Sequence, residues 1–113
     1  MEGINNIHWH DCEIESVVEI PSKDLLVLNV KYPEKWEENY FVPKGIVFEG
    51  YHSQEVNEIP FVGNPTILNV DILCEVDTPF QKEGYFKVKI ETNAGDRFVV
   101  AKRVKLLNDQ VSI

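Results

Sequence analysis

The stretch YFKVKIETNAGDRFVVAKRVKL, residues 85–106, holds two segments of strand composition joined by a short polar turn. Over residues 85–92 apolar and polar side chains alternate, which predicts a strand with one buried face. Residues 93–96 (NAGD) are typical of a tight turn, and residues 97–106 return to strand composition. The stretch therefore predicts an antiparallel hairpin, which is the clearest fold signal in the chain.

Two earlier segments predict a second hairpin. In residues 13–20 apolar and polar side chains alternate, with Ile14, Val18 and Ile20 on the same side, which predicts a half-buried strand. Residues 25–32 are more continuously apolar, and the PSKD turn between the two segments contains a proline. We expect the two segments to pair as antiparallel strands.

The middle of the chain is less regular. Residues 41–50 have strand composition, but Pro43 and Gly45 interrupt them, which predicts an edge position or a bulge. Residues 51–59 fit a short strand or a short helix equally well. Residues 66–76 alternate again and predict a strand with one apolar face. That face would carry Leu68, Val70, Ile72, Cys74 and Val76.

The length and composition of the chain bound the fold. It has 113 residues, of which 43% are hydrophobic, and this is enough for one modest core. No segment predicts a helix longer than about two turns. The sequence therefore predicts one all-β domain over residues 1–113, a single antiparallel β-sandwich or small barrel of six to eight strands with at most one short helix.

The formal net charge of −8 is unevenly distributed along the chain. Residues 1–60 contain twelve acidic residues and four lysines, whereas residues 61–113 contain seven residues of each sign. Because phosphate binding depends on lysine and arginine, we expect no nucleic acid ligand. We expect instead a basic protein partner, and the alternative is that the acidic surface serves solubility alone.

The start of the chain and the two cysteines suggest a compartment. Residues 1–7 contain neither a basic segment nor an apolar run, so we expect no signal peptide, no membrane partner and a cytoplasmic location. Cys12 and Cys74 are expected to remain reduced thiols, because a chain with twelve aromatic residues does not need a disulfide to fold. The apolar face predicted around Cys74 would bury it. The oligomeric state is left open.

Residues 32–40 (YPEKWEENY) interrupt the strand pattern with a proline and several charges, which predicts a loop or one helical turn. Aromatic rings beside glutamates are typical of an interface anchor with a polar rim. The predicted partner-binding residues are Tyr32, Trp36, Glu37, Glu38 and Tyr40. The alternative is that Trp36 folds back over an open sheet edge or one end of the core, because most tryptophans are largely buried.

Residues 8–14 (HWHDCEI) are the densest group of reactive side chains. We expect a structural role for His10 and Asp11, in a turn or cap at the entrance to the following strand. If the segment is extended, His8, His10 and Cys12 share one side, and two imidazoles there could form half of a metal site. No motif for covalent catalysis is present and Cys12 is the only candidate nucleophile, so no catalytic residue and no cofactor are predicted.

The two histidines resemble the first metal-binding motif of cupins, which are β-barrel proteins. The sequence PKG at residues 43–45 and His52 partly match the later cupin motif, whereas the glycines of the first motif are absent. This resemblance implies an alternative function, a small metal- or ligand-binding β-barrel that would use His8, His10 and His52.

A second resemblance rests on HDCEI at residues 10–14, LVL at residues 26–28 and GIVFEGY at residues 45–51. These segments resemble a group of small bacterial all-β proteins of uncharacterised function that open with a His-Asp-x-x-Ile/Leu step. Some members of that group are described as immunity proteins of polymorphic toxin systems. The resemblance implies a non-enzymatic interaction domain, with an immunity-type or other accessory protein as its more specific form.

Overall fold

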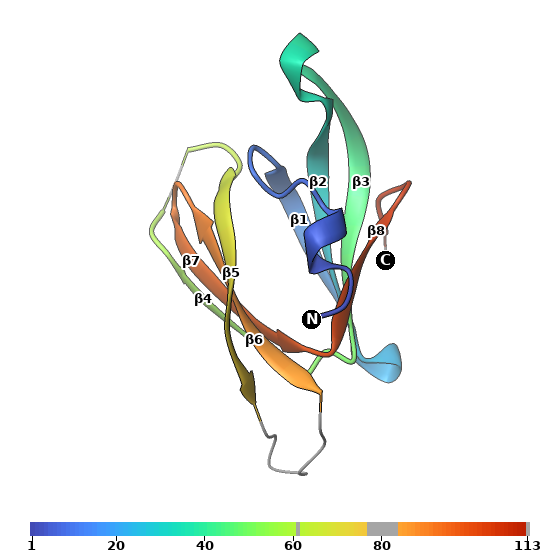
Figure 1. Cartoon of the computed structure of the whole chain (residues 1–113). Coiled ribbons are helices and arrows are strands. Elements are labelled where there is room, and N and C mark those ends of the chain that lie inside the picture. Colours follow the sequence, from blue (N-terminus) through green and yellow to red (C-terminus); the bar gives the residue numbers. More distant parts are fainter. Residues whose placement is uncertain (61, 77–83, 113) are drawn as a thin grey trace.

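The computed structural model describes residues 1–60, 62–76 and 84–112, except for the side chains of residues 74–76. Its described residues form two four-stranded antiparallel sheets that share one core (Figure 1). The first sheet has the order β1-β2-β3-β8 and the second has the order β4-β7-β6-β5. The strands are β1 (Glu13–Ile20), β2 (Leu25–Lys35), β3 (Tyr40–Glu49), β4 (Ser53–Glu58), β5 (Ile67–Val76), β6 (Tyr85–Thr92), β7 (Gly95–Ala101) and β8 (Arg103–Leu107). The prediction of an all-β fold is confirmed, and the fold is a sandwich.

Helical structure in the described residues is limited to three single turns of 3-10 helix. They are η1 (Ile4–Asn6), η2 (Pro21–Lys23) and η3 (Trp36–Glu38), of which η2 joins β1 to β2 and η3 joins β2 to β3. Within the same residues, no helix is long and apolar enough to cross a membrane.

The predicted hairpin at residues 85–106 is only partly correct. Strands β6 and β7 do pair, and a two-residue turn joins Thr92 to Gly95. The segment predicted as one returning strand is two strands, because the chain leaves the second sheet at Lys102 and enters the first sheet as β8. The backbone N–H of Lys102 donates to the carbonyl of Glu49 at 3.0 Å, which fixes this crossing beside the end of β3.

The alternation expected in β1 is broken by a bulge between Ile14 and Ser16. Ile14 and Val17 therefore contact the central core, whereas Val18 packs on the opposite face of the sheet. An extra residue in one strand reverses which side chains face inward, and period-two alternation cannot reveal it.

Strand β2 is continuously apolar because both of its faces are covered. Leu26, Leu28 and Val30 face the second sheet, whereas Val27 faces outward into a smaller cluster. Residues 108–112, which follow β8, cover that outer face. The amide of Asn29, which is only 3% exposed, donates to the carbonyl of Val111 and accepts from its N–H, at 2.7 and 2.8 Å.

The edge position considered for residues 41–50 applies to only part of β3. Over Gly45 to Glu49 the strand is internal, between β2 and β8, which corrects the prediction. Pro43 pairs with Lys31 of β2 in the part of β3 that lies beyond the end of β8. A proline is tolerated there, because that side of the strand has no ladder partner to receive an N–H.

Strand β5 departs from its predicted apolar face. Leu68 is 44% exposed and Ile72 is 41% exposed, although both were expected to be buried. Register shifts next to both residues interrupt the alternation, and β5 is an edge strand. The predicted burial of Cys74 and Val76 concerns side chains that lie outside the described residues.

Candidate functional site

The β2–β3 hairpin extends beyond the other strands of its sheet and ends in η3 (Figure 1). The prediction of a loop or one helical turn over residues 32–40 is correct only for Trp36–Glu38, which form the helical turn η3, because β2 continues through Pro33 to Lys35. Strand β1 pairs with β2 no further than Lys31, so Pro33 removes no donor from the β1–β2 ladder. The hairpin tip is thus a projecting, strand-supported structure.

The five predicted partner-binding residues divide into buried and exposed members. Tyr32 is 9% exposed and its hydroxyl accepts a hydrogen bond from the backbone N–H of His8 at 2.8 Å, so it belongs to the core and not to the surface. Trp36 is 57% exposed and Tyr40 is 52% exposed. The exposed members of the predicted set are Trp36, Glu37, Glu38 and Tyr40.

Trp36 is exposed but not free to turn. Its indole Nε1 donates a hydrogen bond of 2.6 Å to Oδ2 of Asp11, which lies 25 residues earlier in the chain. A ring fixed by one polar contact keeps its apolar faces accessible without losing further conformational freedom on binding.

The partner of this bond, Asp11, lies in a tight turn. The N–H of Cys12 donates to the carbonyl of Trp9 at 3.2 Å, and Asp11 has a φ of 73°, the left-handed conformation that asparagine and aspartate tolerate best. The turn buries Trp9 and Cys12 together and leaves His10 exposed. The expected extended arrangement, with His8, His10 and Cys12 on one side, is therefore wrong.

The pKa values of Asp11 and Cys12, which are neighbours in this turn, are shifted in opposite directions. The hydrogen bond from Trp36 lowers the pKa of Asp11, and His10, whose Nδ1 lies 3.0 Å from Oδ2, lowers it further, while partial desolvation opposes the change. Burial raises the pKa of the Cys12 thiol to about 12, and the charge of Asp11 adds to the effect. Cys12 is thus a neutral thiol that donates to the carbonyl of His8 at 3.1 Å, and it is unsuited to nucleophilic chemistry.

Two clefts flank the indole of Trp36. The larger, of about 790 Å³, is lined by Asp11, Glu13, Lys31, Trp36, Asn39, Tyr40, Phe41 and Thr66. The smaller, of about 460 Å³, is lined by His8, Tyr32, Pro33, Glu34, Lys35, Trp36, Glu37 and Glu38. Trp36 is the one residue that appears in both of these linings, so the two clefts meet at this residue.

A further loop segment, the described residues 59–60 and 62–66, borders the larger cleft through Thr66. Asn64 donates from Nδ2 to Oε1 of Glu13 at 2.9 Å, and Thr66 lines the cleft. Ile59 and Val62 of this loop are exposed apolar residues. We call the surface formed by the turn at residues 9–12, the hairpin tip at residues 36–41 and this loop the loop end.

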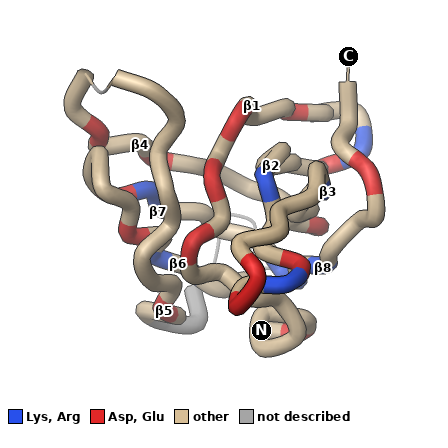
Figure 2. Tube along the Cα trace, turned by 90° about the horizontal axis from the view of Figure 1, so that it is seen from above, with Lys and Arg blue, Asp and Glu red and all other residues tan. Residues whose placement is uncertain are grey.

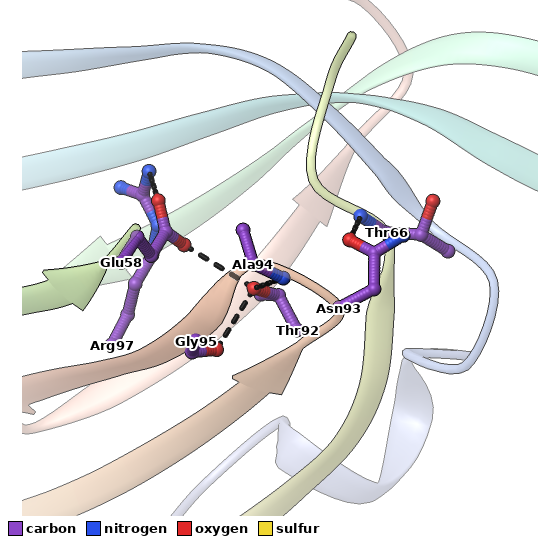
Figure 3. Close-up of polar contacts among 7 residues, drawn as sticks. All are labelled: Glu58, Thr66, Thr92, Asn93, Ala94, Gly95 and Arg97. Atoms are coloured by element: carbon purple, nitrogen blue, oxygen red, sulfur yellow. Dashed lines mark hydrogen bonds and ion pairs between the residues drawn. The ribbon is translucent and has the colours of Figure 1, made fainter. Parts of the chain in front are cut away.

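A polar network holds the base of the loop end in place (Figure 3). Arg97 donates to both carboxylate oxygens of Glu58, each at 2.8 Å, and the Thr92 hydroxyl donates to the carbonyl of Gly95 at 2.8 Å. Asn93 accepts from the N–H of Thr66 at 3.0 Å through its side chain. The N–H of Ile59 donates to the carbonyl of Ala94 at 3.0 Å, so Ile59 and Thr66 are both tied to the β6–β7 turn.

Acidic groups dominate the surroundings of the loop end. Figure 2 shows acidic residues recurring along β1, which leads away from the Asp11 turn. At the tip, Lys35 lies 3.8 Å from Glu38 and Lys44 lies 2.9 Å from Glu34. Glu37 has no ion-pair partner among the described residues, so the tip keeps a negative balance.

The histidines of the alternative metal site are not brought together. His8 and His10 flank Trp9 near the loop end, whereas His52 precedes β4 and packs edge-on against Tyr85, with 5.9 Å between ring centroids. Over residues 1–60, 62–76 and 84–112, no three His, Cys, Asp or Glu side chains form a group that could hold a metal ion. The described residues do not provide the site that the cupin resemblance implied.

Several residues that line the larger cleft were not predicted as site residues from the sequence. Glu13, Lys31, Phe41 and Thr66 line the larger cleft, but each reads as an ordinary strand residue. The sequence signals that did point to this end were the run of aromatic residues and glutamates at the tip and the cluster of reactive side chains at residues 8–14. No known protein-family model matches this chain, and no curated protein matches it.

Proposed function

We propose that this protein is a non-enzymatic interaction domain whose loop end binds a basic protein partner, with Trp36 as the anchor. The observation that carries the proposal is the exposed Trp36, whose indole is held by Asp11 and which lines two neighbouring clefts. Tryptophan is highly buried on average, and at interfaces it is enriched among the residues that dominate binding energy.

The charge of the anchor's surroundings supports a basic partner. Residues 1–60, which supply the hairpin tip and the Asp11 turn, contain the whole negative excess of the chain. Acids around an aromatic anchor accelerate association with a positively charged surface and disfavour nucleic acid. An immunity-type or accessory protein acting in the cytoplasm is the more specific form of the proposal, and that form rests on the sequence resemblance and composition alone.

The proposal is tested by capturing partners from the native host and measuring their binding kinetics. Trp36→Ala should weaken binding by roughly thirtyfold or more, because truncating an anchor commonly costs about 2 kcal/mol or more. Most of this change should appear in the dissociation rate. The double change Glu37→Lys with Glu38→Lys should instead slow association and reduce its salt dependence.

Leu73→Ala is the matched control, since Leu73 is also a large apolar residue, 48% exposed, but lies on β5 away from the loop end. It should leave affinity unchanged. A captured partner that binds Trp36→Ala as tightly as the unmodified protein would place the interface elsewhere and refute the proposal.

A further inference from the structure

The larger cleft at the loop end has two chemically different walls. Asp11 and Glu13 supply carboxylates from the turn and the start of β1. Trp36, Tyr40 and Phe41 supply aromatic rings from the hairpin tip, and each of these rings is more than one-third exposed. Because Lys31 also lines the cleft, it is not simply an acidic patch, and its selectivity depends on how these groups are arranged.

Asp11 and Glu13 each use only one carboxylate oxygen in hydrogen bonds within the described residues. Oδ2 of Asp11 accepts a hydrogen bond from Nε1 of Trp36 and lies 3.0 Å from Nδ1 of His10. Oε1 of Glu13 accepts a hydrogen bond from Nδ2 of Asn64. Among the described residues, no hydrogen bond or ion pair is formed to Asp11 Oδ1 or Glu13 Oε2. Lys31, the cross-strand neighbour of Glu13, is outside ion-pair distance of it. Two acceptor atoms therefore remain for a ligand.

Because the indole N–H of Trp36 is bonded to Asp11, the faces of the ring are suited to binding a cation. The Nε1–H of Trp36 is already bonded to a carboxylate, so the ring has no free donor and contributes to the cleft only through its π surface and edges. Tryptophan is the best of the aromatic side chains at attracting a cation over its face. A planar cation that stacks on a ring and also bonds carboxylate oxygens is a guanidinium group.

We propose that the larger cleft binds an arginine side chain of the protein partner, its guanidinium lying between the aromatic residues of the tip and the free oxygens of Asp11 and Glu13. This inference rests on the proposed function and makes it more specific. Lysine fits less well, because its ammonium group can neither stack nor form a two-pronged bond with a carboxylate.

The test uses the full chain and a probe that needs no identified partner. N-acetyl-argininamide is titrated while the indole N–H resonance of Trp36 is followed by NMR, with the buried Trp9 as an internal reference. The argininamide should cause a saturable shift of the Trp36 signal alone. The neutral isostere N-acetyl-citrullinamide should cause none, and N-acetyl-lysinamide should bind at least about fivefold more weakly.

Two variants locate the probe. Glu13→Gln should weaken argininamide binding at least about fivefold, and it removes charge without removing bulk. Glu55→Gln is the matched control, because Glu55 is an exposed carboxylate on β4 that lines neither cleft, and it should leave binding unchanged. If Glu13→Gln is poorly folded, Tyr40→Ala tests the opposite wall of the cleft with the same expected loss.

Failure of this inference is distinguishable from failure of the proposed function. An unsaturable response, or equal responses to argininamide and citrullinamide, would overturn the arginine site whatever Trp36→Ala does to a captured partner. A partner that loses affinity with Trp36→Ala but not with Glu13→Gln would likewise reject the arginine site while leaving the interaction surface in place.

Discussion

Glu58 and Asp11 both have carboxylates close to the same end of the sandwich. They differ in how many of their carboxylate oxygens are bonded to other side chains. Glu58 bonds Arg97 through both oxygens, and the side chains of the pair are only 11% and 14% exposed. Asp11 receives its two side-chain donors on one oxygen and lies at the rim of an open cleft. Both oxygens of Glu58 therefore stabilise the fold, whereas one oxygen of Asp11 remains able to bond a ligand.

The largest effect expected from this difference is on stability at Glu58. Glu58→Ala should lower the free energy of unfolding by about 3 kcal/mol, because it leaves the largely buried Arg97 guanidinium without its counterion. Urea denaturation measures the change. The exposed Glu37→Ala is the control and should change stability by less than about 0.5 kcal/mol. A cost below about 1 kcal/mol for Glu58→Ala would mean that water replaces the carboxylate and that the comparison fails.

The sequence predicted what depends on local periodicity and missed what depends on distant contacts. The β6–β7 hairpin was predictable, because each of its strands has one face toward the core and one toward solvent. The bulge in β1 and the transfer of the chain between sheets at Lys102 were not, since neither changes the residue composition of its strand.

In the candidate site, too, local sequence predicted some features, whereas others depend on contacts between distant segments. The aromatic and acidic composition of the hairpin tip drew attention to Trp36, but its exposure depends on β2 and β3 extending past their neighbours. The bond from Trp36 to Asp11 joins residues that lie 25 positions apart, and no pattern in either segment encodes it. The burial of Tyr32 likewise depends on His8, which the fold brings to it.

A second effect concerns Cys12, which lies on the buried side of the turn that exposes Asp11. In the native protein Cys12 should react with iodoacetamide at pH 8 at least about a hundredfold more slowly than in urea, because it is buried and burial raises its pKa to about 12. Mass spectrometry of the Cys12 peptide measures the rate. Rapid native labelling would show that the turn opens readily, so that Asp11 could not hold Trp36 in one orientation.

A smaller effect is expected from the Asp11–Trp36 bond itself. Asp11→Ala should lower the free energy of unfolding by about 1 kcal/mol, since a hydrogen bond to a charged acceptor is lost at a partly exposed site. Trp36→Phe removes the donor and keeps a ring. The double-mutant cycle of the two changes should give a coupling of about 0.5 to 1 kcal/mol, and additive effects would mean that the bond does not form in solution.

The smallest effect is the pH dependence that Asp11 contributes. In the folded protein the pKa of Asp11 lies below the ordinary value of an aspartate, chiefly because of the hydrogen bond from Trp36. The folded state therefore binds fewer protons on this group than the unfolded state, so its contribution is fully present above about pH 4 and is lost as the pH falls below the ordinary value. Asp11→Asn keeps an oxygen that can accept from the indole but cannot titrate.

Urea denaturation between pH 6 and pH 2.5 measures this contribution. The unmodified protein should exceed Asp11→Asn in stability by well under about 1 kcal/mol at pH 6, because solvent screens a partly exposed carboxylate. The difference should shrink as the pH falls below about 4. A difference that stays constant down to pH 2.5 would mean that the charge of Asp11 contributes nothing to the fold, and the whole of its bond to Trp36 would then be of the neutral kind that asparagine can replace.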